Sequence, residues 1–237
     1  MLTEVSQILA EHGLILRGGF HPAAEEGALL QHASTVLLVG NAGGAMWDAF
    51  SPHIDGQRNP LDRWTKRVID PIAEKFGARA VYPFGADAPP FQRWALRAEA
   101  VHASPIGILI HSEYGLWHAY RAALLFPERT DLPLHSDAPS PCETCIEKPC
   151  LSACPVGAFT GTAYNVSACA AHLATPESTC LSVGCHARNA CPVGKEWRYL
   201  EAQVSFHMAA FARSVGPGKP DPTRDISDQA ARRSTAL

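Results

Sequence analysis

The sequence predicts an α/β fold in the front of the chain and a small cysteine-rich domain behind it. Segments with helical and strand-like spacing alternate over residues 1–135, and STVLLVG (34–40) has the β-branched run and final glycine of a buried strand. All eight cysteines lie between Cys142 and Cys191, so the composition changes abruptly after the front region. We therefore expect a front domain at 1–135, a cysteine domain at 136–214 and a flexible tail at 215–237.

The order of elements follows from the spacing of apolar residues. Residues three or four apart share a helix face, which predicts helices at 5–11, 22–32, 61–76, 91–101 and 196–213. Pro71 is expected to bend the third of these helices. Extended or alternating runs predict strands at 14–20, 34–40, 79–84, 106–111 and 116–126. The tryptophans on apolar faces are expected in the core: Trp47, Trp64, Trp94 and Trp117.

Charge and hydropathy exclude several classes of function. The chain has 20 Lys and Arg against 23 Asp and Glu, a net charge of −3, so no general basic field attracts nucleic acid or anionic lipid. The N-terminus lacks the basic end and apolar run of a secretory signal, and no stretch of about 18 apolar residues occurs. We expect a cytoplasmic protein without a membrane segment, whose reduced thiols serve metal or redox chemistry.

The cysteines form two runs that each end in Cys-Pro. Residues 142–155 read C-x2-C-x4-C-x3-C-P, residues 169–192 read C-x10-C-x4-C-x5-C-P, and the pentapeptide ACPVG occurs at 153–157 and again at 190–194. In two-cluster ferredoxins the last cysteine of a run binds the other cluster. This logic assigns one 4Fe-4S cluster to Cys142, Cys145, Cys150 and Cys191, and a second to Cys154, Cys169, Cys180 and Cys185. One cluster with unligated thiols, zinc sites, and disulfides remain as alternatives.

This order of motifs resembles that of epoxyqueuosine reductase, whose relatives include the reductive dehalogenases. The front region is also similar to the cobalamin-processing proteins of the methylmalonic aciduria type C family. The likeness is carried by the cysteine runs, CAAHL (169–173), PFGADAPPFQRWA (83–95) and SPIGILIHSEYGLWHAYRAALLF (104–126). It implies a nitroreductase-like, cobalamin-binding α+β front domain joined to a two-cluster ferredoxin-like domain.

The resemblance also implies which residues serve the cofactor. The candidate cobalamin cradle consists of Ser104, Pro105, Gly107, His111, Tyr114 and Gly115, and Asp87 is the candidate proton donor. Taken alone, His111 is more simply a polar residue at a strand end, and Asp87 a turn residue before Pro89. The loop NAGGA (41–45) lacks the known nucleotide-binding motifs and is expected to be a tight connection.

These features predict an iron–sulfur oxidoreductase in which two 4Fe-4S clusters pass single electrons to cobalamin in the front domain. The reduced cobalamin would be used for cofactor processing or for reduction of a small substrate. The expected partners are a low-potential electron donor of the reduced ferredoxin or flavodoxin type, and a small-molecule substrate or corrinoid; nucleic acid is not expected. The alternatives are a non-catalytic electron-transfer protein without corrinoid and a flavin-containing reductase.

Overall fold

The computed structural model describes residues 1–23, 26–85, 89–133 and 138–216. Within these residues the chain divides into two compact units that interleave along the sequence. Among the described residues, unit 1 comprises those of 1–102, 109–141 and 193–198, and unit 2 comprises 103–108, 142–192 and 199–216. Two short segments, 103–108 and 193–198, therefore belong to a different unit from the residues that flank them in the sequence.

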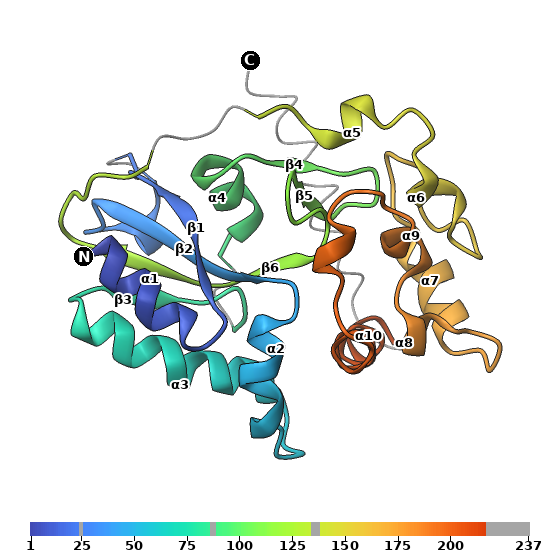
Figure 1. The fold of residues 1–237 in the computed structure, drawn as a ribbon, viewed down its shortest axis with the longest axis horizontal. Coiled ribbons are helices and arrows are strands. Elements are labelled where there is room, and N and C mark those ends of the chain that lie inside the picture. Colours follow the sequence, from blue (N-terminus) through green and yellow to red (C-terminus); the bar gives the residue numbers. More distant parts are fainter. Residues whose placement is uncertain (24–25, 86–88, 134–137, 217–237) are drawn as a thin grey trace. The chain divides into compact units, whose positions relative to one another are not determined.

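Unit 1 is built on a four-stranded antiparallel sheet with the strand order β1-β2-β6-β3 (Figure 1). The strands are β1 (Ile15–Phe20), β2 (Thr35–Ala42), β3 (Arg79–Val81) and β6 (His118–Phe126). β2 and β6 pair along their whole lengths, from Thr35 opposite Phe126 to Ala42 opposite His118. Every residue of β2 is buried, as the apolar run at 34–40 predicts for a strand that is covered on both faces.

Helices cover both faces of this sheet. α4 (Phe91–Ala98) brings Trp94 into one core cluster with Val36 and Leu38 of β2. Leu37 points to the opposite face, because neighbouring residues of a strand alternate in direction. Figure 1 shows α1 (Leu2–Ala10) and α3 (Pro60–Lys75) on the face opposite α4, where α1 contacts β1, and α3 contacts β3 and β6. The result is the mixed α/β arrangement that the sequence predicts.

Most of the expected elements of unit 1 are confirmed. α1 and α3 correspond to the predicted helices at 5–11 and 61–76, and α3 continues through Pro71. α2 (Ala45–Phe50) follows β2 after a short connection, and β4 (Val101–Ala103) pairs with β5 (Leu109–His111) in a separate two-stranded sheet. The four tryptophans expected in the core are buried: Trp47, Trp64, Trp94 and Trp117.

Three helix predictions need correction. The helix expected at 22–32 is wrong: its described part holds only a 3-10 turn, η1 (Ala28–Leu30), because Gly27 and His32 have φ angles of 71° and 67°, which no α-helix accepts. The helix expected at 91–101 ends at Ala98, where the chain becomes extended and enters β4. The helix expected at 196–213 begins only at Glu201, after a separate 3-10 turn, η3 (Lys195–Trp197).

Unit 2 consists mainly of short helices joined by turns. They are α6 (Pro149–Ser152), α7 (Val166–Leu173), α8 (Cys180–Val183), α9 (His186–Asn189) and α10 (Glu201–Val215), and α5 (Pro141–Thr144) lies at the junction with unit 1. α10 packs against α7 and α8, and Met208 and Phe211 contact a core that contains Val166, Cys180 and Val215. The ferredoxin-like character of this unit stays a prediction.

None of the helices that the structure describes combines the length and the apolar character needed to cross a bilayer.

Candidate functional site

All eight cysteines are described, and all are free thiols. Cys180 and Cys191 are buried, and the other six are partly buried. Among the described residues, no three His, Cys, Asp or Glu side chains are grouped so that they could hold a metal ion.

One set of cysteine neighbours centres on Cys150, which is the second residue of α6. The pKa of the Cys150 thiol is raised, first by burial and then by the charges that Cys191 and Cys145 would carry as thiolates. Cys142 lies in α5, three residues before Cys145, so the two stand one helical turn apart in sequence. The backbone N–H groups of Cys150 and Leu151 donate to the Cys150 sulfur and partly offset the rise in the pKa of Cys150.

A second set of neighbours involves three helices and one loop of unit 2. Cys169 lies in α7, Cys180 begins α8 and Cys185 caps α9. Burial raises the pKa of Cys169 most, and Cys154 and Cys180 add negative charge to its surroundings. Burial is also the main cause that raises the pKa of Cys185. The negative charges of Cys169 and Cys180 raise it further.

Several groups donate hydrogen bonds to the sulfurs of this second set. The Ala158 N–H donates to Cys154 Sγ over 3.3 Å, and the N–H groups of Ala187 and Arg188 donate to Cys185. The Tyr164 hydroxyl is hydrogen-bonded to Cys169. Hydrogen bonds from protein donors stabilise thiolate, which is the form that binds iron. The donor set of eight sulfurs therefore fits iron–sulfur clusters.

The interior of unit 1 holds a second candidate site, built around a buried cation. Arg17 of β1 is 1% exposed and forms an ion pair with Glu99, with 2.7 Å between Nη2 and Oε1. Glu99 also accepts a hydrogen bond from the Tyr120 hydroxyl of β6. The Arg17 guanidinium donates to the Asn41 carbonyl over 3.4 Å and lies 3.2 Å from His118 Nδ1. Few charged residues are buried this completely without such partners.

Aromatic rings enclose this cation. The Arg17 Cζ atom lies 5.2 Å from the Tyr114 ring centroid and 5.0 Å from that of Tyr120, within cation–π range. Tyr114 stacks on His111 with 4.4 Å between ring centroids, and it meets the Trp197 ring edge-on at 4.9 Å. The predicted cradle residues His111 and Tyr114 thus belong to a polar and aromatic network that spans β1, β5 and β6.

His111 is held as a neutral imidazole in this network. It lies at the end of β5, and its Nδ1 atom accepts hydrogen bonds from the backbone N–H groups of Glu113 (3.1 Å) and Tyr114 (3.3 Å). An Nδ1 atom that accepts two hydrogen bonds cannot carry the proton, which leaves Nε2 as the protonated nitrogen. Burial and the nearby Arg17 charge lower the pKa of His111 to about 4. His111 therefore offers a hydrogen-bond donor at Nε2.

The structure places the six predicted cradle residues in two groups. Ser104, Pro105 and Gly107 form the turn between β4 and β5, where the Gly107 N–H donates to the Ser104 carbonyl over 3.0 Å. These three belong to unit 2, whereas His111, Tyr114 and Gly115 belong to unit 1. Asp87, the candidate proton donor, lies outside the described residues.

Gly115 is a contact point inside unit 1. A Cβ atom at Gly115 would lie 2.1 Å from the Val193 carbonyl oxygen, and one at Gly194 would lie 2.5 Å from the Tyr114 carbonyl carbon. Both glycines have positive φ angles, of 56° and 68°. Val193 and Gly194, the last two residues of the second ACPVG repeat, therefore pack backbone to backbone on the turn that follows His111 within unit 1.

The loop at 41–45 is a tight connection. The Gly43 N–H donates to the Trp117 carbonyl over 2.9 Å, and a Cβ atom at Gly43 would lie 3.0 Å from the Trp197 ring. An N–H group that already has a protein partner is not available to hold a phosphate. The loop thus forms a short connection between β2 and α2, and the lack of an anion site there stays a prediction.

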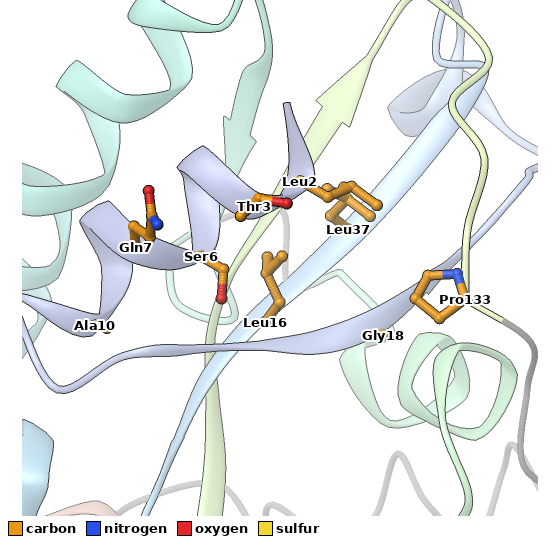
Figure 2. Close-up of a pocket in the computed structure, with 9 residues that line it drawn as sticks. All are labelled: Leu2, Thr3, Ser6, Gln7, Ala10, Leu16, Gly18, Leu37 and Pro133. Carbon is orange, nitrogen blue, oxygen red and sulfur yellow. The ribbon is translucent and has the colours of Figure 1, made fainter.

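A pocket of ≈ 540 Å³ lies elsewhere in unit 1, between α1 and the sheet (Figure 2). Its lining is mostly apolar or small, and consists of Leu2, Thr3, Ser6, Gln7, Ala10, Leu16, Gly18, Leu37 and Pro133. No predicted cradle residue is among them. A pocket of this volume suits a drug-sized molecule, whereas a corrinoid with its nucleotide tail is much larger. The pocket therefore does not fit cobalamin.

Sequence reasoning missed the buried ion pair and the residues around it. Arg17 interrupts the apolar run LILRGGF, and Tyr120 stands within the alternating strand at 116–126. A single charge in a strand that is otherwise apolar signals a buried partner. That signal does not identify Glu99, which is 82 residues away in sequence.

Comparison with known proteins returned solved structures of epoxyqueuosine reductase. The enzyme from Streptococcus thermophilus is 17% identical with a TM-score of 0.48, over 81% of this chain and 66% of that chain, slightly under two-thirds. A crystal structure with an epoxyqueuosine-modified tRNA-Tyr stem loop is 16% identical with a TM-score of 0.48, over 94% of this chain and 70% of that chain. A selenomethionine-labelled epoxyqueuosine reductase is 16% identical with a TM-score of 0.49, over 94% of this chain and 71% of that chain.

No protein-family model matches the chain, and no curated protein matches its sequence. The structural likenesses lie below a TM-score of 0.5, so neither the fold assignment nor the function below rests on them.

Proposed function

We propose that this protein is an iron–sulfur oxidoreductase whose unit 2 binds two 4Fe-4S clusters. The observation that supports this most directly is that cysteines of each proposed set lie near enough to one another for their thiolate charges to raise the pKa of Cys150, Cys169 and Cys185. Cys150 has Cys145 and Cys191 as charged neighbours, and Cys169 has Cys154 and Cys180. Cationic iron bound between such thiols would remove the like-charge penalty and favour the thiolate form.

The proposed ligand sets follow these neighbours. One cluster would be held by Cys142, Cys145, Cys150 and Cys191, and the other by Cys154, Cys169, Cys180 and Cys185. Each set includes the last cysteine of the other Cys-Pro run, Cys191 in the first set and Cys154 in the second, as in two-cluster ferredoxins. When bound, the clusters would accept and pass single electrons. The chain would hold the thiolates in place, donate N–H and O–H hydrogen bonds to the sulfurs, and shield them partly from water.

We further propose that the electron acceptor is a cobalamin bound to the front domain, for cofactor reduction or processing or for reduction of a small substrate. The support is the resemblance of residues 83–95 and 104–126 to cobalamin proteins, together with the network of His111, Tyr114 and Arg17. Because the described pocket does not fit a corrinoid, we derive no step through the cobalt.

Two other functions remain as alternatives. The protein would be a non-catalytic ferredoxin-type carrier if the front domain binds no cofactor. It would be a flavin-containing reductase if the front domain holds flavin. In each case the proposed electron source is a reduced ferredoxin or flavodoxin type donor.

Cofactor extraction from protein purified without air separates these possibilities. The proposal predicts iron and acid-labile sulfide in every preparation, and a change in the visible spectrum of added cobalamin when the protein is present. Clusters without any corrinoid or flavin binding would support the carrier. Zinc in place of iron, with no sulfide, would reject the iron–sulfur function altogether.

Nucleic acid stays outside the proposed partners, on the basis of the net charge of −3. An epoxyqueuosine reductase has been crystallised with a tRNA stem loop, so tRNA is the appropriate challenge. We expect no binding of tRNA at 150 mM salt in a filter or gel-shift measurement. Saturable binding at that salt would show that a local basic surface outweighs the net charge.

A further inference from the structure

Tyr164 occupies a rigid turn of unit 2 beside the second set of cysteines. It forms an isolated β-bridge with Phe159, and the two rings stack with 4.6 Å between centroids and 14° between their planes. The Asn165 N–H donates to the Ala158 carbonyl over 2.8 Å and closes the same turn. The Tyr164 ring also packs against the core that contains Val166, Cys180 and Val215. The ring is therefore fixed from several sides.

The Tyr164 hydroxyl faces sulfur. It is hydrogen-bonded to Cys169, and the thiolate charges of Cys169, Cys185 and Cys154 all lie within electrostatic range of it. A tyrosine hydroxyl has an ordinary pKa of about 10 and carries its proton at neutral pH, so it acts as the donor and the sulfur acts as the acceptor.

A hydrogen bond to a ligating sulfur changes the energy of the two redox states unequally. The reduced cluster carries one more negative charge than the oxidised cluster, and hydrogen bonds to more negative acceptors are stronger. Donors to the sulfurs therefore favour the reduced state, and hydrogen bonding is one of the factors that set the potentials of iron–sulfur clusters. One such hydrogen bond in this set runs from the Ala158 backbone N–H to Cys154 Sγ.

We propose that the Tyr164 hydroxyl raises the reduction potential of the cluster held by Cys154, Cys169, Cys180 and Cys185, through its hydrogen bond to Cys169 Sγ. This inference rests on the proposed two-cluster function. It assigns Tyr164 a positioning and tuning role, distinct from ligation. It also makes the two clusters distinguishable, because one side chain that can be replaced acts on only one of them.

The test is a redox titration of the full-length protein carrying Tyr164→Phe, followed by electron paramagnetic resonance. Phenylalanine keeps the stacking on Phe159 and removes only the hydroxyl. We expect the equilibrium constant for reduction of one cluster to fall roughly tenfold, a shift of about 59 mV to lower potential for a one-electron couple. The potential of the other cluster should stay unchanged.

Tyr82→Phe is the matched control, because the Tyr82 hydroxyl of unit 1 donates to Asp70 and has no cysteine partner among its hydrogen bonds. Both cluster potentials should equal those of the wild type in this variant. A Tyr164→Phe protein that contains both clusters at unchanged potentials would overturn the inference and leave the proposed function standing. A wild-type protein without iron and sulfide would overturn both.

A second measurement applies if Tyr164→Phe loses a cluster. Protein produced with 3-fluorotyrosine carries a more acidic hydroxyl, which is a stronger hydrogen-bond donor. Its effect should have the opposite sign, so the potential of the same single cluster should rise. An unchanged or lowered potential in the fluorinated protein would contradict the inference.

Discussion

Arg17 shows how one residue can organise the interior of unit 1. Its guanidinium meets a carboxylate, a backbone carbonyl, a histidine and the faces of two tyrosines, and its side chain is 1% exposed. A buried ion pair adds little net stability compared with an apolar pair, but the loss of one partner leaves the other charge buried and uncompensated. The pair is therefore best tested by removing one partner and then both.

Arg17→Met should lower the free energy of unfolding by about 3–5 kcal/mol, because Glu99 is left without a counter-charge. Arg17→Met combined with Glu99→Gln should recover part of this loss. Urea denaturation at pH 7 measures both effects. Arg63→Met is the control, since the Arg63–Asp55 pair is more than one-third exposed on each side and should contribute less than about 1 kcal/mol. Equal losses at positions 17 and 63 would contradict the buried network.

His111 predicts a dependence of stability on pH. Its folded pKa of about 4 lies below the ordinary value of 6.5, so between these values the unfolded chain binds more protons than the folded protein. Stability is thus complete above about pH 6.5 and falls as the pH drops toward 4. The full difference corresponds to at most about 3.4 kcal/mol, and solvent at the half-buried ring reduces this to about 1 kcal/mol.

His111→Asn should remove this part of the pH dependence. Urea denaturation of the wild type and the variant at pH 7 and pH 5 gives the comparison, with His53→Asn as the control at an exposed position. A variant that loses as much stability as the wild type between these pH values would show that other groups are responsible.

Chemistry at single residues was only partly predictable from the sequence. The eight cysteines are predicted as ligands from their residue type and spacing, and His111 from the family resemblance, and both assignments stay predictions. The sequence did not predict the buried network, because the proximity of its members depends on the register of β1, β2 and β6. These members are Arg17, Glu99, His118 and Tyr120. That register is set by long-range pairing, which a single sequence does not reveal.

At the scale of elements, Gly194 of the second ACPVG repeat packs closely on the turn between β5 and β6, which contains Gly115. Gly194→Ala should cost more than about 2 kcal/mol, because the new methyl group would combine an unfavourable φ of 68° with a backbone atom 2.5 Å away. Gly77→Ala is a close control: it has a φ of 65° but no neighbouring atom within 4 Å. It should cost only about 1–2 kcal/mol. Thermal unfolding of both variants tests this, and equal costs would refute the close contact.

The grouping of cysteines is testable with one variant per set. Cys145→Ser should impair only the first cluster, and Cys180→Ser only the second. Each variant should therefore keep about half of the wild-type iron and one of two cluster signals in electron paramagnetic resonance. Loss of the same signal in both variants would show that the sets are drawn incorrectly.

Strongly periodic elements were predictable, and elements that end in unusual backbone conformations were not. α1, α3, β2 and β6 match their predicted positions because long apolar patterns dominate local preferences. The segment 22–32 has helical spacing, but Gly27 and His32 adopt positive φ angles and leave only three residues in a 3-10 turn. Turn conformation at these two positions depends on how the chain packs, and spacing does not encode it.

At the scale of the whole molecule, the composition predicts a front region without cysteine and a cysteine-rich region behind it. It does not reveal that 103–108 belongs to unit 2 or that 193–198 belongs to unit 1. The unit to which such a segment belongs depends on backbone contacts such as that between Gly115 and Val193. Amino-acid composition does not reveal these contacts.

The central claim is that unit 2 binds two 4Fe-4S clusters, and the most direct measurement is the iron and acid-labile sulfide content of anaerobically purified or reconstituted protein. The account predicts about eight iron and about eight sulfide per chain, from two clusters of four each. Zinc or iron without sulfide, or a content near four of each in fully loaded protein, would contradict it.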